Sequence, residues 1–404
     1  MKYYHIITIA NHEAKLLRRS ILFQIFTGLA ILGIPFLQLI NQGGDNLFWY
    51  KIALPSSFPF INVYLYNLLQ TLVIIFACTE REKQSMTRYT IEVLQCHPVS
   101  NYEFCIGKIL GIFKEFIKIN FYVLIIGALI NIWGSNAPFR IELYLFYFFT
   151  LTLPTLFFIS GFTLWLTRMI RSQVLIILIL IIYFLCNYFY FSRIQFGIFD
   201  FLSHTLSYQF SDITGYTALP KFLLVRLGYT LLGIGFLYLW NRIWQRPDNK
   251  VSGKWNTYMI SILFFLPGSI GILYSWHDCQ NQENRRELYR ETYLHYQPEA
   301  KARAIQNDIT YRSNGKYMSV TSKLSVQNQN KDTLSRVILY LNPTLHVTKI
   351  QENTLKVDYS RENQVIVLHK KLAPAERITL DIDYHGKIDD AICYLDFPEE
   401  EISN

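Results

Sequence analysis

The chain shows two hydropathy patterns, one after the other. Up to about residue 276, apolar residues gather in long runs that short polar segments separate. From about Thr310 onward, apolar and polar residues alternate instead. A helix needs about 20 apolar residues to cross a hydrocarbon core, whereas alternation is typical of half-buried strands. The pattern therefore predicts a helical membrane region followed by a small β domain.

Seven runs are long enough to span a membrane. Pro154 falls in the middle of the fourth run and Pro267 in the seventh, and a helix bundle tolerates both as kinks. The first run is too long for a signal peptide, and Leu37–Ile40 lacks the small residues of a cleavage site, so we expect an anchor. The runs cover Ser20–Ile40, Phe58–Cys78, Ile119–Trp133 (helical from about Phe104), Glu142–Leu166, Gln173–Phe191, Lys221–Trp240 and Tyr258–Trp276.

The alternating region predicts short strands separated by turns such as Asn342-Pro343 and Pro374. Strands of this length and spacing are typical of a sandwich with its own core. The expected strands are Met318–Thr321, Leu324–Gln327, Val337–Tyr340, Leu355–Val357, Val365–Leu368 and Ile378–Ile382.

We therefore expect an α-helical polytopic membrane protein with a six-span core and a seventh span, followed by a small extracytoplasmic β-sandwich. A charged segment joins the two parts, and Pro298 is expected to divide it into two helices. The expected domains are the six-span core (1–245), a cytoplasmic loop with the seventh span (246–276), a helical stalk (277–309), the β-sandwich (310–397) and a tail (398–404).

Basic residues are distributed unevenly over the loops. The segments 1–19, 79–118, 167–172 and 241–257 carry 16 Lys and Arg, whereas the alternate segments carry only Lys51, Arg140 and Arg193. Because cytoplasmic loops are enriched in basic residues, this asymmetry predicts a cytoplasmic N-terminus and a C-terminal domain outside. The net charge of +8 thus reflects membrane topology and gives no reason to expect a nucleic-acid partner.

Arg226 is the notable charge within a predicted span. It lies about one and a half turns inside the outer end of the sixth span. An arginine inside a membrane can mark a substrate path, so Arg226 is our candidate for the translocation path. The more ordinary alternative is that its side chain snorkels to the outer interface.

The cytoplasmic segment after the second span combines charge with an amphipathic pattern. It starts with the charged turn Thr79–Gln84, and Tyr89–Leu94 can lie on the membrane surface as a short helix. Pro98 ends that helix, and Ser100 with Glu103 forms a capping box for the next one. A cytoplasmic motor could push against such a helix; the simpler alternative is a solvated basic loop.

The same segment resembles a known family. Glu80-Arg81-Glu82, Glu92-Val93-Leu94, Pro98-Val99-Ser100, Glu103-Phe104 and Gly107-Lys108 are together similar to the signature of type-2 ATP-binding-cassette (ABC) exporter permeases. The resemblance covers about residues 1–245. It implies a coupling helix near residues 79–100 that docks into a separate ATPase subunit. Gln84 departs from the family, which often has glycine there. The implied coupling residues are Glu80, Arg81, Glu82, Arg88, Pro98, Gly107 and Lys108.

The chain has no phosphate-binding loop of its own. The motif needs Gly-Lys followed by Ser or Thr, but Ile109 follows Gly107-Lys108 and Trp255 follows Gly253-Lys254. We therefore expect no enzyme activity and no cofactor in this chain, and ATP hydrolysis by a partner.

The tail carries a second resemblance. Leu339–Pro343, Asp383–Gly386 and Cys393-Tyr394-Leu395 are similar to parts of the N-terminal β domain of aminopeptidase-N-like zinc peptidases. The H-E-x-x-H zinc motif of that family is absent, since Leu16 occupies its last position after His12-Glu13, so we expect neither a metal site nor peptidase activity. Cys279 and Cys393 are both predicted outside, and whether they pair stays open.

Two functions follow as expectations. The first is the permease subunit of an ABC exporter in the inner (cytoplasmic) membrane, working with an ATPase subunit and a second, identical or related, permease half. A periplasmic partner or peptidase would then act at the β-sandwich. The alternative is a scaffold that transports nothing and presents a periplasmic binding domain or anchors a peptidase. The sequence does not specify a cargo.

Overall fold

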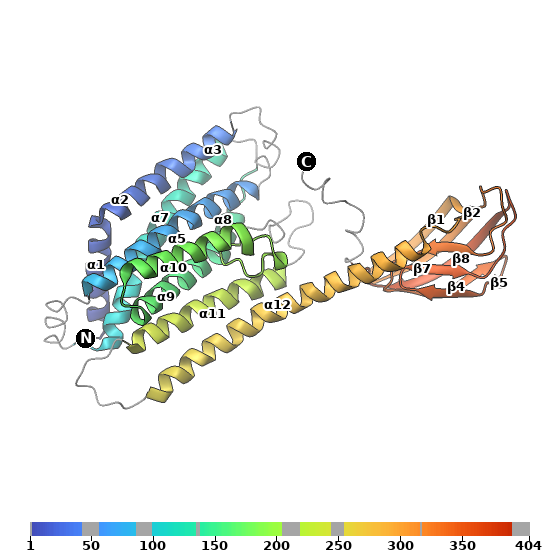
Figure 1. Ribbon diagram of the computed structural model, residues 1–404. Coiled ribbons are helices and arrows are strands. Elements are labelled where there is room, and N and C mark those ends of the chain that lie inside the picture. The colour runs from blue at the N-terminus through green and yellow to red at the C-terminus, as the bar shows by residue number, and fades with distance from the viewer. Residues whose placement is uncertain are drawn as a thin grey trace. The chain divides into compact units, whose positions relative to one another are not determined.

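The computed structural model describes residues 2–42, 56–85, 99–134, 138–203, 219–243, 254–315 and 317–389. It divides into two compact units, Met1–His277 and Asp278–Asn404. The first unit consists of helices and the second is mainly β-sheet, as the two hydropathy patterns predicted (Figure 1).

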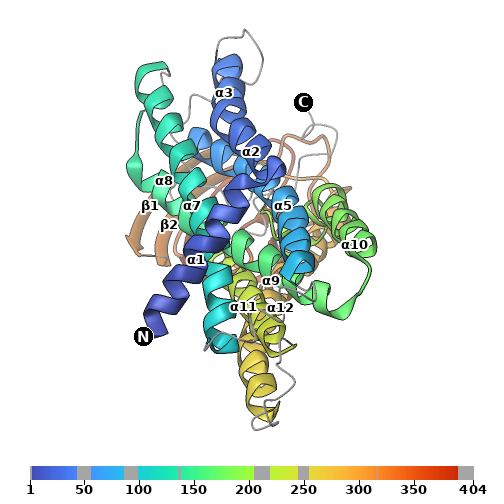
Figure 2. The same ribbon diagram turned by 90° about the vertical axis from the view of Figure 1, so that its left-hand side faces the viewer.

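The first unit is a helical bundle. Figures 1 and 2 both show α5 inside it, with α7 on one side and α10 on the other. Three of its segments are π-helical turns (η1, η2 and η3). The elements are α1 (Lys2–Arg19), α2 (Ile21–Gly28), η1 (Leu29–Gly33), α3 (Ile34–Gln42), α5 (Ser57–Ser85), α7 (Asn101–Gly134), α8 (Ile141–Tyr147), η2 (Phe148–Thr152), α9 (Leu153–Met169), α10 (Gln173–Cys186), η3 (Asn187–Phe191), a short 3-10 turn η4 (Gln195–Gly197), α11 (Leu219–Ile243) and α12 (Lys254–Tyr296).

The described residues include seven helical segments that are long and apolar enough to cross a membrane. This confirms the predicted number of membrane-length helices and is consistent with a multi-pass membrane protein. Buried residues make up 61% of the most apolar window of Ser57–Ser85 and 72% of that of Ile141–Met169, so these two spans form the centre of the bundle. The others are Ile21–Leu39, Tyr102–Trp133, Gln173–Phe191, Leu219–Asn241 and Tyr258–Tyr296.

Prolines shape two of the spans. The π turn η1 comes just before Pro35, and η2 comes just before Pro154. A proline has no N–H and its ring collides with the carbonyl one turn earlier, so a wider turn relieves both problems. The helix α12 continues through Pro267, as predicted for a kink inside a bundle.

Glycines let neighbouring helices approach closely. A Cβ on Gly161 of α9 would lie 2.4 Å from the carbonyl oxygen of Gly233 in α11. Between α7 and α1, a Cβ on Gly107 would lie 2.8 Å from the Cβ of Ile9. The α1 helix itself was not predicted, since the sequence suggested only a basic segment before the first span.

The second unit starts in the last part of α12 and continues as two antiparallel sheets. The larger sheet has the order β1-β2-β8-β4-β5, and the smaller has β3-β7-β6. All of the paired strands are antiparallel. The strands are β1 (Arg303–Asn314), β2 (Tyr317–Gln327), β3 (Val337–Tyr340), β4 (Leu345–Glu352), β5 (Leu355–Lys356), β6 (Tyr359–Glu362), β7 (Val365–Leu368) and β8 (Arg377–Gly386).

Both sheets contribute to one apolar core. Ile366 of the smaller sheet is buried together with Ile350 and Leu380 of the larger sheet. The opposite face of the smaller sheet is covered by Tyr296, the last residue of α12, which packs on Val365 and Val367. Covering both faces explains why all four residues of β7 are buried. The unit is thus sandwich-like.

The boundary between stalk and β domain differs from the prediction. The segment after α12 contains no second helix, because the chain turns after Tyr296 and enters β1 at Arg303. The predicted division by Pro298 and the stalk end at residue 309 are therefore wrong. Every residue of β1 is exposed, so the strand lacks the apolar alternation that would have revealed it.

Candidate functional site

A buried charged cluster connects four helices of the bundle. Its centre is Glu82, in the last turn of α5, with only 2% of its surface exposed. The Nζ of Lys108 on α7 lies 2.7 Å from one carboxylate oxygen of Glu82. The other oxygen accepts a hydrogen bond of 3.1 Å from the indole of Trp240 on α11 and pairs with Arg168 at the end of α9. We call Glu82, Lys108, Arg168 and Trp240 the Glu82 cluster.

Local sequence explains how Lys108 reaches this cluster. The backbone N–H of Ser100 donates to the Glu103 carboxylate at 2.9 Å, and the Glu103 N–H donates to the Ser100 hydroxyl at 3.2 Å. This confirms the predicted capping box and fixes the start of α7. Two turns later, Lys108 is fully buried and also donates to the Ser85 hydroxyl at 2.8 Å.

The cluster holds two cations against one carboxylate. Removing three charged side chains from water is costly, and their mutual attraction compensates only when the geometry is good. The indole of Trp240 and the hydroxyl of Ser85 complete the hydrogen bonding around the charges. We conclude that the cluster acts as a clamp, because separating α5 from α7 or α9 would leave Lys108 or Arg168 buried without its counter-ion. Separating α5 from α11 would break the hydrogen bond from Trp240.

Neighbouring residues of α5 have different surroundings. Arg81 lies 3.1 Å from the carboxylate of Glu13 on α1 and donates to Gln84 at 2.6 Å. Glu80 is exposed and accepts a hydrogen bond of 3.0 Å from Gln84. The Glu80-Arg81-Glu82 motif thus directs its side chains to the surface, to α1 and to the bundle interior.

The structure brings together only part of the predicted coupling set. Glu82 and Lys108 are in direct contact, but both are buried, so neither presents its charge on the surface. Gly107 has a packing role against α1. Arg88 and Pro98 lie outside the described residues, as does the predicted amphipathic helix between them.

Sequence reasoning missed Glu13, Arg168 and Trp240 as partners of this motif. Arg168 had been counted only as a basic loop residue, although it belongs to the last turn of α9. The one signal in the sequence that could have indicated a buried partner is the charge of Arg168 at the end of the apolar segment that forms α9. Trp240 is 158 residues away from Glu82 in the sequence, so nothing local indicates the contact.

Arg226 is buried rather than snorkelling, because its guanidinium is held inside the bundle with 2% of the residue exposed. It donates to the carbonyl of Thr150 at 2.8 Å and to that of Phe201 at 2.8 Å. It also donates to the hydroxyl of Thr155 at 3.1 Å. Arg226 thus gives side-chain hydrogen bonds to backbone around the π turn η2, which precedes Pro154. The snorkelling interpretation is therefore wrong.

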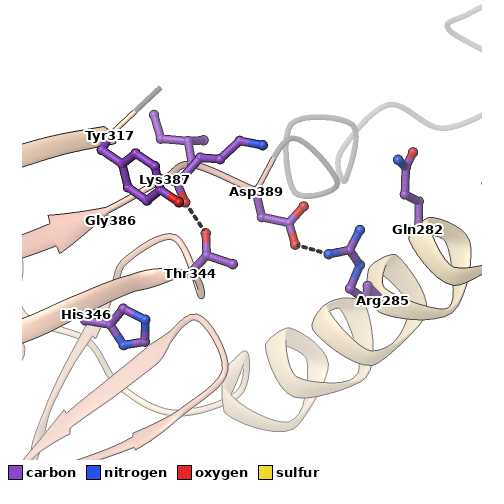
Figure 3. Close-up of a pocket in the computed structure, with 9 residues that line it drawn as sticks. Gln282, Arg285, Tyr317, Thr344, His346, Gly386, Lys387 and Asp389 are labelled. Carbon is purple, nitrogen blue, oxygen red and sulfur yellow. Dashed lines mark hydrogen bonds and ion pairs between the residues drawn. The ribbon is translucent and has the colours of Figure 1, made fainter. Parts of the chain in front are cut away.

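The second unit contains an open pocket of about 390 Å³. On its α12 side, Arg285 points toward Asp389, and their charged groups lie 3.3 Å apart (Figure 3). Asp389 is buried and also accepts a hydrogen bond from Tyr289 at 3.1 Å. The pocket combines cationic, hydroxyl and imidazole side chains. It is lined by Gln282, Arg285, Tyr317, Thr344, His346, Gly386, Lys387, Ile388 and Asp389.

Two predicted features of the second unit have no further structural description. Cys393 lies outside the described part of the chain, so its pairing with Cys279 is not tested. In the described residues, no group of three His, Cys, Asp or Glu side chains could hold a metal ion.

Comparison with known proteins identifies no family for this chain. No protein-family model matches the chain, and no curated protein is significantly similar to it in sequence.

Proposed function

We propose that the chain is the permease subunit of an ABC exporter and that a separate cytoplasmic ATPase drives it. The observation that carries the proposal is the Glu82 cluster. It ties α5, α7, α9 and α11 together at the end of α5 where the segment resembling a coupling helix begins.

The cluster suggests how force would be transmitted. A push on the segment after Ser85 would act on the end of α5. The buried ion pairs would pass it to α7 and α9, and the Trp240 hydrogen bond would pass it to α11. Coupling between distant sites needs an element with discrete arrangements, and a rigidly clamped group of helices can tilt as one. Glu80, exposed on the same turn, is the residue that would contact the ATPase.

The orientation of the chain belongs to the same proposal. The 16 basic residues on one set of segments, against three on the other, support a cytoplasmic N-terminus and an inner-membrane location. The β-sheet unit would then lie in the periplasm. A second permease half, the same chain or a related one, completes the transporter.

The test is co-purification of the intact chain in mild detergent, with ATPase activity assayed in the eluate. Wild-type protein should bring down an ATP-binding-cassette subunit in stoichiometric amount. Glu80→Ala should lose most of that subunit without lowering the thermal unfolding midpoint. Glu82→Gln should lower the midpoint, because it acts on the clamp.

Glu142 provides the matched control. Its side chain is 79% exposed at the start of α8, and Glu142→Ala removes an exposed carboxylate that the proposal does not use. This variant should keep the ATPase subunit. If wild-type protein recovers no nucleotide-binding subunit, the exporter proposal is wrong.

A second candidate function rests on the pocket of the β-sheet unit. A membrane scaffold needs an exposed binding site, and the cavity beside Arg285 and Asp389 offers one. Recovery of periplasmic partners without any ATPase would favour this function, and Lys387→Ala should then weaken the recovery.

A further inference from the structure

Polar side chains without partners gather in the most buried part of the bundle. Asn67, Gln70 and Thr71 of α5 are 0% exposed, and their side-chain nitrogen and oxygen atoms have no hydrogen-bond partner among the described residues. Asn120 of α7 is 0% exposed and also lacks a partner there. Polar groups inside a membrane-spanning bundle are expensive and usually functional.

Several other hydroxyls of the bundle make a local hydrogen bond. Thr27 and Ser160 donate to the carbonyl four residues earlier, at 2.8 Å and 2.5 Å. Thr79, eight residues after Thr71 on the same helix, does so at 2.5 Å. This local bond is the ordinary way to satisfy a hydroxyl in an apolar helix. Thr71 is not using it, so its hydroxyl is left available in the interior.

Asn67 and Thr71 lie on one side of α5. Asn67, Thr71, Cys78 and Glu82 are separated by four, seven and four residues, which places them on one stripe of the helix. Gln70 lies beside that stripe. The stripe ends at the Glu82 cluster, so the polar groups and the clamp occupy the same side of α5.

The α7 helix places Asn120 toward α5. A Cβ on Gly127 would lie 2.0 Å from the Nδ2 of Asn62, and the hydroxyl of Tyr66 donates to the carbonyl of Phe116. Asn120 is four residues after Phe116 and seven before Gly127, so it belongs to the α7 face that meets α5. Gln70 follows Tyr66 by four residues, so it lies close to the α5 face that meets α7, and the unpartnered amides of Gln70 and Asn120 come to a common interface. Asn67 and Thr71 lie on another side of α5.

We infer that Gln70 and Asn120 form an internal binding site for an uncharged ligand rich in hydrogen-bond donors and acceptors. An amide offers both a donor and an acceptor and carries no charge, so these side chains match a neutral polar group better than an ion. The inference rests on the proposed exporter function and places the cargo path beside the α5 stripe rather than at Arg226, whose guanidinium is occupied by backbone carbonyls.

The test is thiol labelling of single-cysteine substitutions at these positions in the intact chain. Gln70→Cys and Asn120→Cys are exposed to three reagents of similar size: neutral hydroxyethyl methanethiosulfonate, its cationic trimethylammonium relative and its anionic sulfonate relative. Mass spectrometry of the digested protein follows each site separately, so the natural cysteines stay in place. Ala30→Cys is the control, since Ala30 is equally buried in another apolar span.

The neutral reagent should label Gln70→Cys and Asn120→Cys at least tenfold faster than Ala30→Cys, and at least tenfold faster than either charged reagent labels the same sites. Equal labelling at Ala30→Cys, or no labelling at all, would overturn the site. Charged reagents that react as fast as the neutral one would overturn the ligand class. Labelling needs no ATPase, so its result is independent of whether an ATPase co-purifies.

Discussion

In the β-sheet unit, buried polar groups are almost all bonded. Arg361 donates to the carbonyls of Asn342 at 2.8 Å and Pro343 at 3.0 Å, and Asn328 donates to the carbonyl of Leu372 at 2.9 Å. Among the described residues of this unit, Gln364 is the one with a buried side-chain atom that lacks a partner. In the helical unit, the amides of α5 and α7 have no partners at the very centre of the bundle.

The difference shows what each unit is built for. A small β domain gains its stability from an apolar core, and an unpaired polar atom there would only cost free energy. Arg361 illustrates the rule: partial burial lowers the pKa of its guanidinium, and carbonyl acceptors surround the charge. Under the proposed function, the helical bundle would keep some polar groups available for a polar cargo, at a cost in stability.

The largest expected effect comes from breaking the Glu82 cluster. Glu82→Gln leaves Lys108 and Arg168 buried without their counter-charge, which should destabilise the bundle by about 3 to 5 kcal/mol. Thermal unfolding of the intact protein in detergent measures the loss. The control Glu142→Gln changes an exposed carboxylate and should leave the midpoint unchanged. An unchanged midpoint for Glu82→Gln would show that the Glu82 cluster does not stabilise the helical bundle.

The next effect lies in the β-sheet core. Leu380 of β8 is fully buried between the two sheets, and Leu380→Ala should cost about 2 to 5 kcal/mol because it leaves a cavity. Hydrogen exchange of the intact chain should show faster exchange in β2, β4 and β8 and no change in α5. Leu355→Ala is the matched control, since Leu355 is 74% exposed. Equal exchange in the two variants would contradict the shared core.

A smaller change in stability, of opposite sign, is expected at Gln70, beside the α5 stripe. Gln70→Leu replaces an unpartnered buried amide by an apolar group of similar size, so it should stabilise the bundle by about 1 kcal/mol. The same change should abolish labelling of Asn120→Cys by the neutral reagent. Destabilisation by Gln70→Leu would mean that the amide has a structural partner, and the contrast between the two units would then disappear.

The smallest effect belongs to a surface pair of the β-sheet unit. Lys370 and Glu352 form an ion pair at the surface, with side chains 28% and 20% exposed. Glu352→Gln should change stability by less than about 1 kcal/mol, because solvent screens such pairs. Raising the salt concentration should remove what effect remains. A loss of stability as large as that of Glu82→Gln would show that burial does not determine how much an ion pair contributes to stability.

Much of the fold follows from local patterns. The long apolar runs predicted seven membrane-length helices. Short apolar runs between turn residues predicted strands such as Val337–Tyr340 and Val365–Leu368 at their observed bounds. Ser100 and Glu103 are three residues apart, so their capping box is readable in the sequence. Local interactions fix all of these features, because the residues involved are neighbours along the chain.

Some strands gave no such signal. The β1 strand is exposed on both faces, and the buried residues of β4 are only Leu345 and Ile350. Without regular alternation, neither segment differs from a polar loop in the sequence. Their pairing with β2 and β8 comes from backbone hydrogen bonds, which the side-chain pattern does not encode.

The sequence by itself determined that this protein has seven membrane-length helices and a separate β domain, because hydropathy and periodicity are properties of consecutive residues. Only the tertiary structure decided the partners of its charges. Glu82 meets Arg168 and Trp240 from distant helices, and Arg226 donates to the carbonyls of Thr150 and Phe201. Such contacts depend on which helix faces come together, and that is settled by packing of the whole bundle.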